Sequence, residues 1–367
     1  MSLKAGIVGL PNVGKSTLFN AITNSHVEAA NYPFATINPN VGSVLVKDNR
    51  VDELVKLFNP KRTVYTSFEF CDIAGLVKGA SKGEGLGNQF LSHIRDVDAI
   101  IEVVRCFDNK DIIHVENSID PIRDVEIINL ELIMADLETV NNRLSKISIK
   151  AQITKDKESI FEYNLLQKIK PNLDNGKAIR NLSFNEEERK ILLNYNLLTI
   201  KPILYIANIS ETDLNNPDNN VYYSKLKEYV ANERNLLLPI SCQIESELSS
   251  LSSEEKELFL NELGIQFSGL DNLIKESYKL LNLSTFFTVG VDEVRAWTFK
   301  NGMKAPDCAG IIHTDFKKGF IRAEVYTYED IMIYKNENAL KENGKIRMEG
   351  KEYVAQDGDI FFFKFNV

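Results

Sequence analysis

Four residues near the start of the chain have the types and spacing needed to hold a phosphate group. Gly9, Gly14, Lys15 and Ser16 complete the pattern G-x-x-x-x-G-K-[ST] between an apolar strand-like run and a helix-like run. The glycines let the backbone wrap a phosphate with its N–H groups pointing inward, at the positive end of the following helix. Lys15 would neutralise phosphate charge, and the Ser16 hydroxyl would bind Mg²⁺. The alternative is a chance match in a strand-to-helix turn.

We expect consecutive residues of this loop to contact a bound Mg-nucleotide. Lys15, which would neutralise the charge of the β- and γ-phosphates, is also predicted to be catalytic. The predicted contacts are Asn12, Val13, Gly14, Lys15, Ser16 and Thr17.

Two other segments carry groups that would complete such a site. Asp72 follows the β-rich run 68–71 and begins the pattern D-x-x-G, so its carboxylate is expected in the Mg²⁺ shell. The N–H of Gly75 would then sense the γ-phosphate. Thr36 lies in a proline-containing loop, and we choose its hydroxyl to complete Mg²⁺ coordination. A turn led by aspartate and a loop threonine that only forms a turn are the simpler alternatives.

The elements that must position these residues can be predicted from the apolar pattern. Residues 3–120 alternate short β-rich runs with helical or glycine-rich stretches, as an α/β domain does. From 121 to 198 the apolar residues repeat every three or four positions and no strand is evident, which predicts a long helical hairpin. Strand character resumes at 202–207. The hairpin is therefore predicted to be an insertion in the α/β domain.

Two further features complete the predicted organisation. The pattern from Ser183 to Glu186 is typical of a capping box and predicts a second helical stretch over 184–198. From 284 onward, aromatic and β-branched runs separated by Gly and Asp turns predict a small β-rich domain. The predicted domains are a nucleotide-binding domain at 1–122 and 199–281, a helical insertion at 123–198 and a terminal domain at 282–367.

Composition and charge exclude several classes of protein. The 367 residues are 44% hydrophobic and 26% charged, no run of eighteen apolar residues occurs, and the start shows no leader, so we expect a cytoplasmic protein without a membrane partner. The net charge of -9 argues against a protein that coats nucleic acid, and DNA is not an expected partner. The four cysteines are scattered, so neither a zinc site nor a disulfide framework is predicted.

The loops described above resemble those of a known family. Gly-Leu-Pro-Asn-Val-Gly-Lys-Ser at 9–16, Asn-Tyr-Pro-Phe-Ala-Thr at 31–36 and Asp-Ile-Ala-Gly-Leu-Val-Lys-Gly-Ala at 72–80 resemble the Obg-related GTPases. The full chain is similar to one branch of them, the YchF or Obg-like ATPase family. Further support comes from the segments 114–124, 292–297 and 312–320. The resemblance implies an α/β P-loop G domain with a mostly parallel sheet and helices on both faces, an inserted helical hairpin or coiled coil, and a C-terminal β-grasp-like TGS domain.

The residues that would read the base depart from the pattern of a GTPase. That fold reads guanine with Asn-Lys-x-Asp, whereas this chain has Asn208, Ile209 and Glu211 at the corresponding positions. The extra methylene of Glu211 displaces the carboxylate, so we expect main-chain groups near Asn208 and Ile209 to read adenine. The resemblance implies the same preference for ATP and places Phe107 beside the base. Ser241 matches a position that supports the base. Core packing of Phe107 and a plain turn at Ser241 are the alternatives.

The group that activates water is also unusual. Position 76 carries leucine where many G proteins have a water-orienting glutamine, so catalysis must come from elsewhere. His114 is the best candidate because it lies in a polar loop after the strand-like run 100–104, and the resemblance also points to it.

The glycine-rich segment 75–87 is expected to act as a switch. In related cation-dependent G proteins an asparagine at the position of Asn12 helps to hold K⁺; a plain loop hydrogen bond is the alternative.

The helical insertion and the terminal domain indicate a large partner. Residues 146–190 hold ten Lys or Arg against seven Asp or Glu, so the helical arm is locally basic and suits RNA phosphate, although a merely solvated face is the alternative. The terminal segment resembles a module associated with RNA or ribosome contact, or else is a structural cap. We therefore expect a Mg-dependent switch that binds and hydrolyses ATP to ADP, acting with the large ribosomal subunit or RNA. The rivals are a nucleotide-gated binding protein with incidental hydrolysis and a GTPase with relaxed base specificity.

Overall fold

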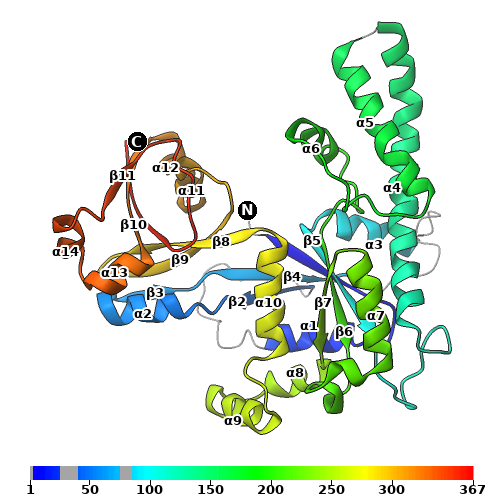
Figure 1. The fold of residues 1–367 in the computed structure, drawn as a ribbon, viewed down its shortest axis with the longest axis horizontal. Helices are drawn as coiled ribbons and strands as arrows, with labels where there is room; N and C mark the ends of the chain where they lie inside the picture. Colours follow the sequence, from blue (N-terminus) through cyan, green and yellow to red (C-terminus); the bar gives the residue numbers. More distant parts are fainter. Residues whose placement is uncertain (1–2, 25–39, 75–84, 155, 367) are drawn as a thin grey trace. The chain divides into compact units, whose positions relative to one another are not determined.

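The computed structural model describes residues 3–24, 40–74, 85–154 and 156–366 of the chain. Contacts divide the chain into two compact units (Figure 1). The first unit comprises Leu3–Ser43 and Glu69–Leu273, and the second comprises Val44–Phe68 together with the residues from Ile274 onward. Within the described ranges, every helix is too short or too polar to span a membrane.

The sheet of the first unit has six strands in the order β2-β4-β1-β5-β6-β7. The pairs from β4 through to β7 are parallel. Every residue of β5 and β6 is buried, as in parallel strands that are covered on both faces; most of these residues are apolar, and Glu102, Arg105 and Asn208 are buried with them. The strands are β1 Lys4–Val8, β2 Val41–Leu45, β4 Ser67–Asp72, β5 Ala99–Arg105, β6 Ile203–Asn208 and β7 Leu236–Ile240.

Helices follow the strands at the carboxyl edge of this sheet. α1 Lys15–Asn24 begins after the loop that leaves β1, and α8 Cys242–Leu248 begins directly after β7. Their N-terminal N–H groups therefore lie at the edge where parallel strands end, which is the usual ligand-binding edge of an α/β sheet. The other helices of this part are α3 Gly85–Arg95, α7 Val221–Asn232 and α9 Ser253–Leu263, with 3-10 turns η3 Glu211–Asp213 and η4 Pro217–Asn219. Helix α10 Gly269–Leu280 begins in the first unit and continues into the second from Ile274.

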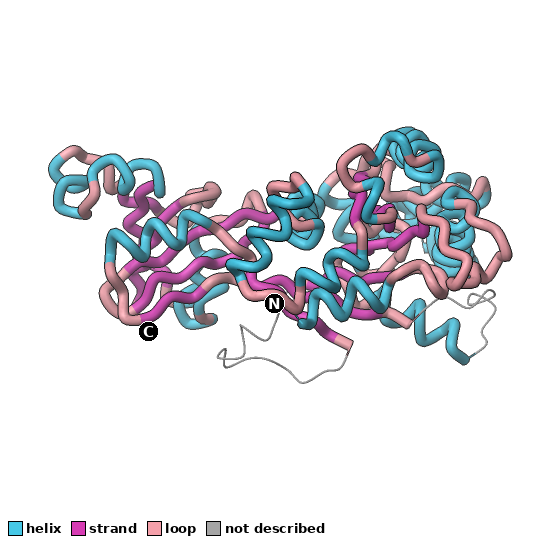
Figure 2. The backbone as a smooth tube through the Cα atoms, turned by 90° about the horizontal axis from the view of Figure 1, so that it is seen from below, coloured by secondary structure: helices cyan, strands magenta, loops and turns pink. Residues whose placement is uncertain are grey.

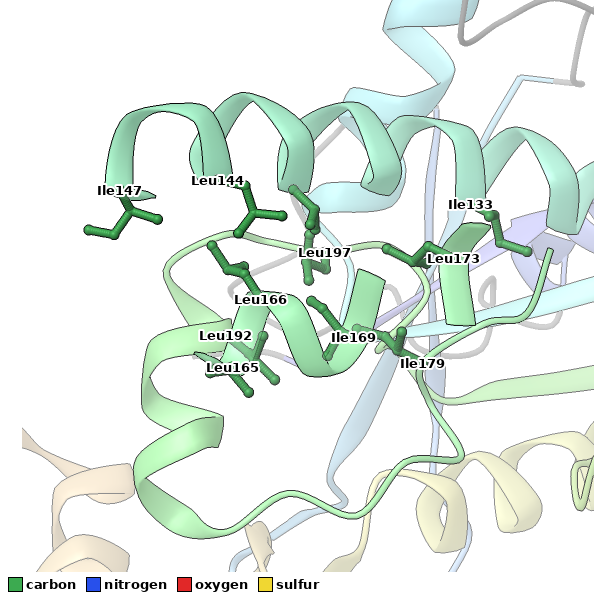
Figure 3. Packing of buried hydrophobic residues seen from close by; sticks show 11 residues of the cluster. Ile133, Leu144, Ile147, Leu165, Leu166, Ile169, Leu173, Ile179, Leu192 and Leu197 are labelled. Carbon is green, nitrogen blue, oxygen red and sulfur yellow. The ribbon is translucent and has the colours of Figure 1, made fainter. Parts of the chain in front are cut away.

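A long helical hairpin lies between β5 and β6 in the sequence. It consists of α4 Pro121–Thr154 and α5 Lys157–Asp174, followed by α6 Glu186–Leu193. The apolar seam of α4 is buried against α5 and α6, and Figure 3 shows the side chains of α4 pointing toward those of α5. Each fully buried leucine or isoleucine of such a cluster contributes about 1.5–3 kcal/mol, so the cluster holds α4, α5 and α6 together.

The helix that follows the hairpin is shorter than predicted and begins later. Its capping box is made by Asn185 and Glu188, so the prediction of a box from Ser183 to Glu186 is wrong. The Asn185 side chain accepts a hydrogen bond from the N–H of Glu188 at 2.8 Å, and the Glu188 side chain accepts one from the N–H of Asn185 at 2.9 Å. Both sequences fit the capping-box pattern, and only the reciprocal bonds distinguish them.

The second unit contains a mixed six-stranded sheet in the order β11-β10-β12-β8-β9-β3. Figure 2 shows strands of this sheet lying side by side. Phe361 and Phe363 of β12 join one buried cluster and Ile360 joins another, because alternate residues of a strand point to opposite faces. The strands are β3 Arg62–Val64, β8 Leu283–Val289, β9 Glu293–Lys300, β10 Phe320–Thr327, β11 Arg347–Glu349 and β12 Asp359–Phe365. The helices are α2 Asn49–Phe58, α11 Ala305–Ile312, α12 Thr314–Lys318, α13 Tyr328–Tyr334 and α14 Glu337–Glu342.

Residues Val44–Phe68 belong to this second unit, whereas the sequence predicted them within the nucleotide-binding domain. β3 pairs in parallel with β9, and Val51 and Leu54 of α2 are buried in the cluster that contains Phe287. The guanidinium of Arg50 also lies 5.0 Å from the centroid of the Phe287 ring. Pairing across more than 200 residues leaves no local pattern, so this difference could not be read from the sequence.

Candidate functional site

A cleft of about 1070 Å³ opens at the carboxyl edge of the parallel sheet. Its walls are the loop after β1, the loop after β5, the loop after β6 and the start of α8. Lining residues that the sequence predicted as contacts are Asn12, Gly14, Lys15, Ser16, Thr17, Phe107, Asn208, Ile209 and Ser241. Residues from four separate stretches of chain therefore line one cleft.

The loop after β1 has a backbone that only particular residues can adopt. Asn12 and Gly14 have positive φ angles of 65° and 100°. Gly14 also passes so close to Asn208 that a Cβ atom at position 14 would collide with the Asn208 side chain. Glycine is thus required at position 14 both for its conformation and for the close approach.

Asn208 ties this loop to the start of α8. Its Nδ2 donates to the carbonyl of Val13 at 2.8 Å, and its Oδ1 accepts from the N–H of Cys242 at 3.0 Å. All three groups are buried, so each bond satisfies a polar atom that water cannot reach. Val13 itself does not line the cleft; its buried side chain packs in the core and its carbonyl anchors the loop.

Lys15 and Asp72 are in direct contact. The Lys15 ammonium forms an ion pair with Oδ1 of Asp72, at the end of β4. Lys15 lines the cleft, whereas Asp72 is not among its lining residues. The structure thus brings together two of the groups expected around Mg-phosphate. Thr36 and Gly75 lie outside the described residues, as do Leu76 and most of the segment 75–87.

The main chain near Asn208 is already engaged within the sheet. The N–H of Ile209 donates to the carbonyl of Ile240 at 3.0 Å, and the carbonyl of Asn208 accepts from the N–H of Cys106 at 2.8 Å. The Ile209 N–H is therefore not available to adenine, and reading of the base by other main-chain groups near Asn208 and Ile209 stays a prediction. The side chain of Ile209 is 2% exposed, so it presents only a small apolar surface to the cleft.

His114 is buried and does not line the cleft. It is 6% exposed, and its Nε2 lies 2.8 Å from Oδ2 of Asp124 at the start of α4. Its Nδ1 accepts a hydrogen bond from the N–H of Glu116 at 3.1 Å. A neutral ring that accepts at Nδ1 carries its proton on Nε2 and donates it to Asp124. Both ring nitrogens are therefore occupied by protein groups.

The backbone next to His114 nevertheless contacts the loop after β1, the phosphate loop (residues 9–16). Nδ2 of Asn12 donates to the carbonyl of Ile113 at 3.1 Å. The histidine is thus one residue away from a direct contact with the loop expected to hold phosphate. Asp124 is also held by Arg123, whose Nη2 lies 3.0 Å from Oδ1.

Several cleft residues were not predicted from the sequence. They include Asp108, Asn109 and Ile112 of the loop after β5, Ser210 and Thr212 of the loop after β6, and Gln243, Ser246 and Glu247 of α8. The signal that could have found them is topological, because loops that follow adjacent parallel strands converge at one edge of a sheet. Their individual residue types carry no motif.

Comparisons with known proteins agree with this architecture. A family model described as "50S ribosome-binding GTPase" matches residues 4–142, and the C-terminal model of the YchF GTPases, described as a protein of unknown function, matches residues 283–366. The "Ribosome-binding ATPase YchF" of Bacillus subtilis (strain 168) is 58% identical over 367 residues, and that of Escherichia coli O157:H7 is 49% identical; each comparison covers 100% of both chains.

A solved structure supports the fold directly. The Schizosaccharomyces pombe YchF GTPase superposes with a TM-score of 0.89 at 43% sequence identity, covering 99% of this chain and 98% of that one. The predicted resemblance and the predicted α/β P-loop fold are confirmed by these matches. Because full-length relatives exceed 30% identity by a wide margin, the chain belongs to the YchF family.

Proposed function

We propose that this chain is a switch that binds and hydrolyses ATP and acts with the ribosome. The observation that carries the proposal is the cleft where the loop after β1 and the start of α8 converge. The side chain of Asn208 joins the two through its hydrogen bonds to Val13 and Cys242. Relatives that match along their whole length carry the name ribosome-binding ATPase. A P-loop family member with this cleft has the groups needed to hold a nucleoside triphosphate.

The residues present fit a Mg²⁺ ion held together with nucleotide. Ser16 lies in the first turn of α1 and lines the cleft, and Asp72 is adjacent through its ion pair with Lys15. In the described ranges no group of three His, Cys, Asp or Glu side chains could hold a metal alone, which suits an ion that takes further ligands from phosphate and water. Thr36 would supply another hydroxyl. When bound, the ion would offset the negative charge of the phosphates.

A monovalent cation would involve Asn12. Its Nδ2 is used on Ile113, so Oδ1 is the atom that can coordinate K⁺ beside the phosphates. ATPase rates measured in equimolar K⁺ and Na⁺ test this part separately. Equal rates would remove K⁺ from the proposal and leave ATP binding untouched.

Adenine selectivity follows from the loop after β6. Glu211 lines the cleft where a guanine-reading aspartate would stand, and Ile209 replaces the lysine that packs along the base. Phe107 and Ser241 also line the cleft and provide apolar and polar surface to a base. Titration with non-hydrolysable ATP and GTP analogues decides between an ATPase and a relaxed GTPase, since equal affinity would favour the latter.

His114 is proposed as the catalytic histidine, with Lys15 neutralising phosphate charge. Because Nε2 carries the ring proton, Nδ1 must leave the N–H of Glu116 before the ring can accept a proton from water. Nucleotide binding acts on the same loop through Asn12 and Ile113. The proposal is therefore that the ring turns toward the cleft only in the nucleotide-bound state.

The other parts are proposed to contact the ribosome. The hairpin of residues 123–198 would present its basic arm, and the domain of residues 282–367 would act as a TGS-like module. The domain at 1–122 and 199–281 would hold nucleotide, except that Val44–Phe68 forms one compact unit with the terminal domain. A cytoplasmic location follows from a ribosomal partner.

Co-sedimentation with ribosomal subunits tests partner and switch together. The wild-type chain should sediment with the large subunit more strongly with a non-hydrolysable ATP analogue than with ADP, and Lys15→Ala should lose that difference. The matched control Lys227→Ala removes an exposed lysine of α7 outside the cleft and should behave as wild type. Absence from ribosomes in every nucleotide state would favour a nucleotide-gated binding protein with another partner.

A further inference from the structure

Arg105 is an arginine buried in the interior of the first unit. It ends β5 and is 1% exposed. Its guanidinium donates to three main-chain carbonyls of the following loop: Nε to Phe107 at 3.1 Å, Nη2 to Asn109 at 3.1 Å and Nη1 to Ile112 at 2.9 Å. A charge buried to this degree is unfavourable unless its donors are satisfied, so the loop and the arginine stabilise each other.

The loop that Arg105 holds is one wall of the cleft. Phe107, Asn109 and Ile112 all line it. The next carbonyl along, that of Ile113, accepts the hydrogen bond from Asn12 of the phosphate loop. One side chain thus sets the path of a segment that runs from the base side of the cleft to the phosphate side.

Only arginine has the geometry for this arrangement. Its planar guanidinium presents N–H groups in fixed directions to three carbonyls, whereas the lysine ammonium is a compact charge that cannot span them. The guanidinium carbon also lies 4.7 Å from the centroid of the Phe107 ring, within the range of a cation–π contact. Arg105 therefore fixes both the backbone of the loop and the ring that faces the cleft.

We infer that Arg105 is a positioning residue for nucleotide binding, which acts by holding Phe107–Ile112 as a preformed wall and by presenting Ile113 to Asn12. This inference rests on the proposed function. Without Arg105 the loop must be ordered when nucleotide binds, and affinity falls by the free energy needed to order it.

The test is calorimetric titration of the full chain with Mg-ATP. Arg105→Lys should weaken binding at least about tenfold, which corresponds to about 1.4 kcal/mol. The Asn12→Ala effect should be smaller in the Arg105→Lys background than in the wild type, because both substitutions act on the same loop. Additive effects of the two substitutions would overturn the proposed route through Ile113.

A second variant, destabilised at a site outside the cleft, shows whether a loss of affinity comes from the loop that Arg105 holds or only from lower stability of the fold. Asp136→Asn weakens a buried carboxylate that accepts from the N–H groups of Leu198 and Thr199 at 2.8 Å each, outside the cleft. It should lower the melting temperature but keep wild-type affinity. If Arg105→Lys does not fold, Arg105→Met takes its place, since an apolar side chain leaves no charge to bury.

The outcomes are distinguishable from failure of the proposed function. If the wild-type chain binds no ATP, the proposed function is wrong, whatever the variants do. If the wild-type chain binds ATP and a folded Arg105 variant binds it within twofold as tightly, the positioning role is wrong. An equal loss of affinity in Asp136→Asn would show that instability alone explains the effect.

Discussion

The side-chain amide of Asn208 donates to the main-chain carbonyl of Val13 across 2.8 Å, joining the end of β6 to the phosphate loop. The two residues are 195 positions apart in the chain. The same side chain receives the N–H of Cys242, so a single asparagine holds three segments of the cleft together. The residue type expected to help read the base is, in the structure, a brace for the phosphate loop.

Removing this brace should weaken both the fold and nucleotide binding. Asn208→Ala leaves a buried carbonyl and a buried N–H without partners, which is expected to lower the free energy of unfolding by about 1–3 kcal/mol. ATP affinity should fall because the loop is no longer held in its positive-φ conformation. Urea unfolding and calorimetric titration measure the two effects. The control Asn301→Ala removes an exposed hydrogen bond from Asn301 to Asn282 in the second unit and should leave the affinity for ATP unchanged.

The buried pair of His114 and Asp124 predicts a separation of binding from turnover. His114→Ala should bind ATP as tightly as the wild type but hydrolyse it at least about a hundredfold more slowly, since general base catalysis contributes that much or more. Single-turnover hydrolysis and equilibrium titration give the two quantities. His313→Ala is the matched control, because His313 is exposed and belongs to the second unit. Turnover that survives the loss of His114 would refute its catalytic role.

The residues of the loop after β6 predict that substitutions there can change the preference for ATP over GTP. Replacing Ile209 by lysine and Glu211 by aspartate creates Asn-Lys-Ser-Asp, in which the shorter carboxylate can accept two hydrogen bonds from guanine. The ratio of GTP to ATP affinity should rise by about tenfold or more, equivalent to about 1.4 kcal/mol. Glu211→Asp alone should have a smaller effect. An unchanged ratio in the double variant would mean that Phe107 or α8 decides the base.

Glu245 predicts a pH dependence of stability. Its carboxylate accepts from the N–H groups of Gly269 at 2.6 Å and Leu270 at 3.2 Å, and burial raises the pKa of Glu245 to about 7. The folded chain therefore retains this proton up to about pH 7, whereas the unfolded chain releases it near the ordinary value of 4.5. The contribution to stability is complete below the unfolded pKa and is lost as the pH rises through the folded one.

The measurement compares the wild type with Glu245→Gln, which cannot titrate. The difference in unfolding free energy between the two should change by about 1–3 kcal/mol from about pH 5 to about pH 7.5, with the wild type losing stability relative to the variant. Urea denaturation at several pH values gives this difference, and other titrating groups cancel in it. A constant difference would show that Glu245 does not titrate in this window.

The core of the fold could be predicted because its signals are local. The strands at 99–105 and 203–208 are mostly apolar, and the hairpin helices carry an apolar seam at helical spacing. The predicted start of α6 is wrong because two capping-box patterns overlap and begin only two residues apart. Small errors of this kind depend on which reciprocal hydrogen bonds form, and that is decided by packing.

Residue types at fixed spacing along one stretch of chain are enough to predict the chemistry of the phosphate-binding loop and to show that a guanine-reading motif is missing. Long-range packing places Val44–Phe68 in the terminal unit, brings Asn208 against Val13, and buries His114 against Asp124. These relationships join residues through space, and a buried polar atom takes whichever partner the fold brings within reach.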